Sequence, residues 1–115
     1  MRLTSSLWVS ALIRRATGEG AFATIVNKGA ESAGAIFVIV DDYSGEIALY
    51  GPAPQMVFEP DEAGERRFTL AGRYSDREEL VKKIDRERSF DPDLWIVEIE
   101  DRSGPHFLDV VDPDA

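Results

Sequence analysis

A short apolar run in the first half of the chain constrains the fold more than any other feature. Residues 35–40 are Ala-Ile-Phe-Val-Ile-Val, so an extended segment here has apolar side chains on both of its faces. The run is far too short to cross a bilayer. Short β-branched runs between turn segments are typical of strands that are covered on both faces. We therefore expect a central strand over residues 34–41.

The size and composition of the chain favour one globular domain. Its 115 residues (12.8 kDa) are 43% hydrophobic and 30% charged, which excludes disordered, collagen-like and coiled-coil chains. A chain of this length buries about two-thirds of its unfolded surface. We expect a single domain over residues 1–115, in which residues 111–115 form a frayed acidic tail.

Further segments have the alternation or the β-branched composition of strands. These are residues 21–28, 46–51, 66–72, 94–101 and 106–111. Short turn-rich connections separate the strands expected at 21–28, 34–41 and 46–51, which favours an antiparallel meander. The acidic segment 55–64 is expected to be a loop that Met56, Val57 and Phe58 pin to the body of the protein.

The segment 94–101 shows the clearest alternation in the chain. Trp95, Val97 and Ile99 are on one parity, and Glu98 and Glu100 are on the other. This pattern predicts a strand with a buried tryptophan.

A first helix is predicted at the N-terminus, with a strand as the alternative. Its apolar residues have helical spacing, and Thr4, Ser5 and Ser6 offer alternative N-caps. The apolar residues are Leu3, Leu7, Trp8, Ala11 and Leu12, widened by Val9 and Ile13. Because this apolar face is broad, we expect the helix to be packed on more than one side. Gly18 and Gly20 should end it.

A second helix is predicted from Asp76 to Phe90. Ser75 and Glu78 have the spacing of a capping box, and Pro92 disfavours helix at Asp91. Its apolar stripe, Leu80, Val81 and Ile84, is narrow, so only one face should cover the sheet. The predicted fold is an α+β domain with a mainly antiparallel sheet of five to six strands packed by two helices.

The charge of the chain limits its partners. Thirteen basic and 22 acidic residues give a net charge of −9, which disfavours nucleic acid and anionic membranes as ligands. The lack of cysteine excludes disulfides and thiolate sites and fits a cytoplasmic location. We expect no signal peptide and no membrane segment.

The basic residues are concentrated in the two predicted helices. If both helices lie on the same side of the sheet, their cations could form a basic interaction face, although an ordinary solvated surface is the alternative. The candidate residues are Arg14, Arg15, Arg86 and Arg88, together with Lys82 and Lys83.

Motifs for catalysis and cofactor binding are weak. No glycine-rich phosphate loop or dinucleotide fingerprint is present, so we expect no cofactor. His106 is the only histidine, and Ser103 is too close in sequence to be a typical triad partner. Five acids could instead converge at one sheet edge and bind magnesium, although turn and surface roles are the simpler interpretation. They are Asp91, Asp93, Glu98, Glu100 and Asp109.

Motifs along most of the chain resemble a family of small bacterial proteins, the domain of unknown function number 1491. The resemblance rests on Leu7–Ala11 followed by Arg14-Arg15, on Ala33-Gly34-Ala35, on Gly51-Pro52-Ala53 and above all on the segment from Phe90 to Leu108. It implies a small cytoplasmic bacterial protein with no assigned activity, cofactor or catalytic residue. The function expected from the sequence is a non-catalytic interaction module with a protein partner or a second copy. A metal-assisted hydrolase and a homodimeric structural subunit are the alternatives.

Overall fold

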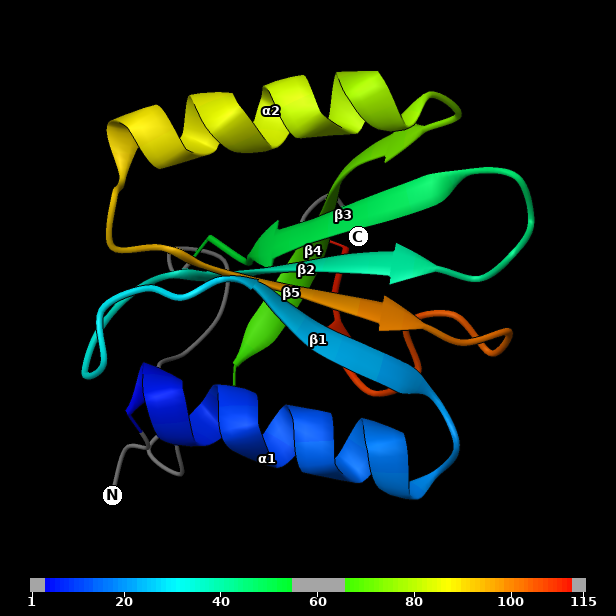
Figure 1. Ribbon diagram of the computed structural model, residues 1–115, viewed down its shortest axis with the longest axis horizontal. Helices are drawn as coiled ribbons and strands as arrows, with labels where there is room; N and C mark the ends of the chain where they lie inside the picture. The colour runs from blue at the N-terminus through cyan, green and yellow to red at the C-terminus, as the bar shows by residue number, and fades with distance from the viewer. Residues whose placement is uncertain (1–3, 55–65, 113–115) are drawn as a thin grey trace.

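The sheet of this protein lies between two helices that pack on its opposite faces (Figure 1). The computed structural model describes residues 4–54 and 66–112. The helices are α1 (Ser5–Gly18) and α2 (Arg77–Phe90). The strands are β1 (Phe22–Asn27), β2 (Ile36–Asp41), β3 (Ile47–Pro52), β4 (Arg67–Tyr74), β5 (Trp95–Glu100) and β6 (Asp109–Val110). The predicted α+β fold, a mainly antiparallel sheet of five to six strands packed by two helices, is confirmed, and the sheet has six strands.

The strand order is β1-β5-β2-β3-β4-β6. Three pairings are antiparallel (β1–β5, β2–β3 and β3–β4), and two are parallel (β2–β5 and β4–β6). The predicted meander of the first three strands is wrong, because β5 is inserted between β1 and β2. β2 and β5, like β3, are buried along most of their length, and the sheet places β2 and β5 side by side in its interior.

Two glycines allow the chain to pass around the start of β5. The loop that connects β1 to β2 lies against Asp93, and Ala30 donates its N–H to the Asp93 carbonyl at 2.9 Å. A Cβ atom at Gly29 or Gly34 would overlap that same carbonyl oxygen. Glycine at both positions therefore permits the crossing that separates β1 from β2.

The larger core lies between α1 and the sheet. Trp95, Val97 and Ile99 all face it, as their alternation predicts, and Val9 and Leu12 pack against them from α1. Thr4 is the N-cap, since its hydroxyl accepts from the N–H of Leu7 at 3.1 Å.

The expectation that α1 is packed on more than one side is wrong. Its buried residues are Ser5, Val9, Leu12 and Ala16, which form a single stripe. Leu7 is 58% exposed and Ala11 is exposed as well. The sequence pattern alone does not show which side of a broad apolar face meets the sheet.

The smaller core lies between α2 and the other face of the sheet. Leu80 and Ile84 of α2 pack with residues of three strands and of the turn before β5, which are Ile39, Leu49, Leu94 and Ile96. Val81, expected in the stripe, is 46% exposed. The helix begins one residue later than predicted, because the N-cap is Asp76, whose carboxylate accepts from the N–H of Glu78, and not Ser75. It ends at Phe90 as predicted.

The central position of β2 is confirmed, since both of its faces are covered. The last strand is shorter than the predicted 106–111, because the segment 105–108 forms a turn that Leu108 closes by donating to the Pro105 carbonyl. The predicted contact of Met56, Val57 and Phe58 lies outside the described residues. Within the described ranges, neither helix is long and apolar enough to cross a membrane.

Candidate interaction surface

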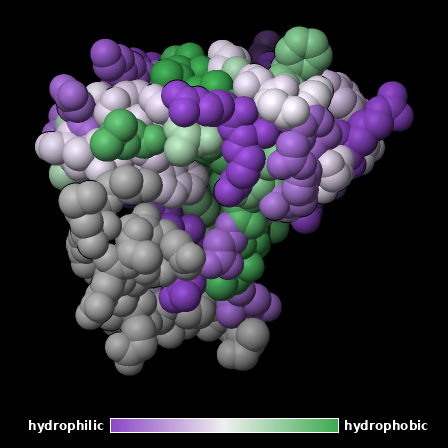
Figure 2. Space-filling model, turned by 90° about the horizontal axis from the view of Figure 1, so that it is seen from below, coloured by the Kyte–Doolittle hydropathy of each residue, from purple (hydrophilic) through white to green (hydrophobic). Residues whose placement is uncertain are grey.

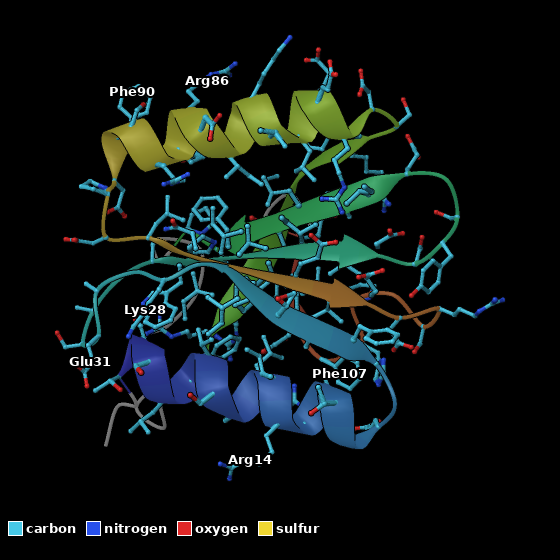
Figure 3. The ribbon with its side chains drawn as sticks, viewed as in Figure 1. Arg14, Lys28, Glu31, Arg86, Phe90 and Phe107 are labelled. Atoms are coloured by element: carbon cyan, nitrogen blue, oxygen red, sulfur yellow. The ribbon has the colours of Figure 1, made fainter. Side chains whose placement is uncertain are left out.

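The four arginines predicted to form an interaction surface do not form one continuous face. The condition for that face, both helices on the same side of the sheet, does not hold (Figure 1). Arg14 and Arg86 point away from the sheet in opposite directions (Figure 3). The two pairs, Arg14 with Arg15 and Arg86 with Arg88, stay predicted interaction residues on two separate surfaces.

Within each pair, one arginine makes local contacts. The guanidinium of Arg15 donates to the carbonyl of Phe107 and lies 5.9 Å from the centroid of its ring. Arg88 lies 3.8 Å from the carboxylate of Asp85. Arg14 and Arg86 form no ion pair with the other described residues. Lys82 and Lys83 also pair within α2, with Glu79 and Glu87 respectively.

The acidic residues proposed as a magnesium site do not converge. Glu98 is nearly buried on an interior strand, and both of its oxygens accept from Arg77, at 3.3 and 2.7 Å. This hydrogen bonding raises the pKa of Arg77. Asp109 lies on β6, away from Glu98 on β5, and forms an ion pair with Arg67 of β4 at 3.3 Å. Among the residues that the structure describes, no three acidic or histidine side chains are close enough to hold a metal ion together. The alternative of a convergent acidic site at a sheet edge is therefore not found among these residues.

His106 lies in a polar cluster at the end of α1. One ring nitrogen is 3.4 Å from Glu19, and the other is 3.4 Å from Asp101. The Ser103 hydroxyl is hydrogen bonded to Asp101 at 2.5 Å and not to the histidine. A serine nucleophile needs the histidine as its direct partner, so this order of contacts is that of a turn and not of a triad.

One hollow lies where β1, the last turn of α2 and the turn after it meet. Its volume is about 420 Å³, and it is open to solvent. It is lined by Asn27, Lys28, Asp85, Arg88, Ser89 and Pro92. Asp85 faces Arg88, so Lys28 supplies the single excess positive charge of this lining, which is little with which to hold an anion.

The outer edge of β1 is a surface that the sequence analysis missed. Phe22, Ile25 and Val26 are 72%, 44% and 50% exposed, and β1 is an outermost strand of the sheet. Three of the nine large apolar side chains exposed among the described residues therefore lie on this one short strand. Seen from the side of α1, hydrophobic and hydrophilic residues are interleaved, with hydrophobic patches along the upper rim of the view (Figure 2).

The helices leave one side of β1 uncovered. α1 packs against β1 and β5, whereas α2 covers β2, β3, β4 and β5 on the other face. Phe22 and Thr24 pair with Glu100 and Glu98, and cross-strand partners share a face of the sheet. Because Glu98 contacts Arg77 of α2, Phe22 and Thr24 lie on the α2 side, beyond the reach of that helix. A signal was present in the sequence: residues 20–27 contain no charge in a chain that is 30% charged.

Comparison with known proteins identifies close structural relatives. A family model described as protein of unknown function (DUF1491) matches residues 3–109, which confirms the resemblance noted in the sequence. The solution structure of a protein from A. tumefaciens is 46% identical, with a TM-score of 0.82 and coverage of 97% of both chains. The crystal structure of a DUF1491 family protein from Caulobacter crescentus is 39% identical, with a TM-score of 0.78, and covers 97% of this chain and 100% of that one. Among curated proteins, none matches this chain.

Proposed function

Because this chain belongs to the DUF1491 family of bacterial proteins, whose description names no activity, we propose a function from its geometry: a non-catalytic interaction module of the cytoplasm. The docking surface of this module is the outer edge of β1. The observation that supports this assignment most directly is the exposure of Phe22, Ile25 and Val26 on β1, which has no neighbouring strand on its outer side within the part of the chain that the structure describes.

An open strand edge is suited to binding another extended segment. Its outward N–H and C=O groups have no partner in the sheet, and an added strand satisfies them while side-chain contacts provide specificity. Proteins that avoid such pairing place charged residues or proline on the edge strand. β1 has neither from Phe22 to Asn27; its one irregularity is a bulge at Val26.

The charged residues that were candidates for a site make contacts within the fold. Glu98 is held by Arg77, Asp109 by Arg67, and Arg15 by the carbonyl of Phe107. These contacts engage side chains that were candidates for catalysis or docking. They support a binding role for the apolar edge in preference to a role for these charged side chains.

Partner capture with charged edge variants tests the proposal. We expect Val26→Lys to reduce recovery of specific partners from the native host by about tenfold or more, because a lysine on an edge strand opposes strand addition. Leu70→Lys on β4 is the matched control, since Leu70 is a similarly exposed strand residue at 45%. Melting temperatures of both variants establish that the fold is retained. Equal recovery with wild type and both variants would mean that the β1 edge is not the docking surface.

A further inference from the structure

We propose that the occupant of the β1 edge is a second copy of this chain, paired antiparallel about a two-fold axis close to Thr24. The inference rests on the proposed function and names its partner. Two six-stranded sheets then form one continuous sheet across the paired β1 strands. Symmetric interfaces of this kind, in which one surface patch meets itself, are the commonest in soluble oligomers.

The sequence of β1 is self-complementary in this arrangement. With Thr24 opposite the second copy's Thr24, Ala23 lies opposite its Ile25, and Phe22 faces the bulged end of the strand, where Val26 of the second copy lies. Aromatic with β-branched residues and threonine with threonine are favourable cross-strand pairs. All three exposed apolar side chains of β1 therefore gain an apolar neighbour from the same strand of the other copy.

The charges at the two ends of β1 select the antiparallel orientation. Glu19 precedes the strand and Glu100 is the cross-strand partner of Phe22, so this end is acidic. Lys28 follows the strand at the other end. Antiparallel pairing brings Lys28 of each copy toward the acidic end of the other, whereas parallel pairing would place like charges together.

The sheet face that α2 covers has space for the second copy next to β1. α2 reaches as far as β5, and Phe22 and Thr24 on the same face of β1 are exposed, so a neighbouring strand has room there. Phe22 is the most exposed of the large apolar residues of the strand and lies on this side. Pairing would remove its ring from water, which is favourable in proportion to the apolar area buried.

The net charge determines how salt acts on this dimer. Each copy has a net charge of −9, so two copies repel one another over long range. Salt screens this repulsion, and a kosmotropic salt such as sulfate also strengthens apolar burial, so self-association through β1 is expected to tighten as the sulfate concentration rises. Docking of arginines on acidic surfaces would weaken under the same change. The sign of the salt effect therefore distinguishes the two modes.

Cross-linking provides a direct test, because the chain has no cysteine. In an antiparallel pair, directly opposed Cα atoms are about 4.5–5.5 Å apart, which lies within the range that a disulfide spans. We expect Thr24→Cys to give a disulfide-linked dimer under mild oxidation. Ala71→Cys, an exposed strand residue on β4, is the matched control and should stay monomeric.

Sedimentation of the unmodified chain completes the experiment. We expect a concentration-dependent dimer that tightens with sulfate and whose association constant falls about tenfold or more in Val26→Lys. A wild-type monomer at all concentrations, or a dimer that Val26→Lys leaves unchanged, would overturn the self-pairing. If the chain is monomeric and Val26→Lys still abolishes capture of a foreign protein, the interaction function stands and only the second copy is excluded.

Discussion

The two edges of the sheet differ in how they are protected. The β1 edge is a six-residue strand without charges, and three of its large apolar side chains are exposed. At the opposite edge, β6 has two residues and pairs with Arg67 and Phe68 of β4, and Asp109 within it forms an ion pair with Arg67 at 3.3 Å. The rest of β4 carries a bulge at Ala71 and the charged Arg73. Short strands and charges are the devices by which proteins prevent sheet edges from pairing. The β1 edge is uncharged and has one bulge, at Val26, so it is the less protected of the two edges, which favours it as the place where a partner strand would bind.

The residues that lead into each edge differ as well. Phe107 and Leu108, just before β6, are buried in the larger core, and Val111 just after it donates its N–H to the carbonyl of Phe68 at 2.8 Å. The loop after β1 is held instead by contacts to Trp95 and to α1. The indole N–H of Trp95 donates to the Ala30 carbonyl at 2.7 Å, and Ser6 donates its N–H to the Glu31 carbonyl at 3.0 Å.

Truncation of Trp95 has the largest expected effect, and the effect should be uneven between the edges. Trp95→Ala removes a buried ring and the hydrogen bond to Ala30, so the free energy of unfolding should fall by about 3–5 kcal/mol. Chemical denaturation measures the loss, and hydrogen exchange should show more opening in β1 than in β6. Trp95→Phe, which keeps much of the volume, should lose less. An unchanged denaturation midpoint for Trp95→Ala would contradict the burial of this side chain.

The ion pair between Arg77 and Glu98 should give the next largest effect. Arg77→Met leaves the Glu98 carboxylate, whose side chain is 11% exposed, without its charged partner. We expect a loss of about 1–3 kcal/mol in unfolding free energy, because an unpaired buried charge is costly and Arg77 itself is half exposed.

A second substitution provides the control for this pair. Adding Glu98→Gln removes the buried charge, so the double variant should be more stable than Arg77→Met alone. Urea denaturation of the two single variants and the double variant gives the coupling between the residues. If the losses in unfolding free energy of the two single variants add up to the loss of the double variant, the ion pair between Arg77 and Glu98 does not stabilise the fold.

The comparison of the edges also shows what local sequence predicts well. The alternation at Trp95, the apolar run of β2 and the proline after Phe90 each act on neighbouring residues, and each predicted its element correctly. Strand order was not predictable in this way. The short turn-rich segment after β1 resembles a hairpin loop, but Gly29 and Gly34 allow it to cross over Asp93 so that β5 enters between β1 and β2.

The candidate site was missed for a related reason. Phe22, Ile25 and Val26 have the composition of a core strand, and apolar residues in a sequence do not reveal whether a neighbouring strand covers them. The arginines were misplaced relative to one another because the side of the sheet on which a helix packs depends on the path of the whole chain. Position at an edge is a property of the assembled sheet, so the exposed β1 surface becomes visible only when the strand order is known.

The smallest expected effects separate the two arginines at the end of α1. Arg15 anchors the segment before β6, since its guanidinium donates to the Phe107 carbonyl and lies over the Phe107 ring. Arg15→Glu should therefore lower the free energy of unfolding by about 1 kcal/mol and increase hydrogen exchange in β6. Arg14 is exposed and points away from the sheet (Figure 3), so Arg14→Glu should change stability by less than about 0.5 kcal/mol.

A binding measurement then decides whether Arg14 has a role outside the fold. If Arg14 contributes to an interface with an acidic partner, Arg14→Glu should reduce partner recovery at low salt, and the difference from wild type should shrink as salt rises. Arg86→Glu on α2 is the matched variant on the opposite face, because Arg86 is equally exposed and also makes no ion pair with other described residues. Loss of recovery in only one of the two variants would identify the face that a partner contacts beside the β1 edge. Unchanged recovery in both, with the fold intact, would show that these arginines are ordinary surface residues and that docking depends on the apolar edge alone.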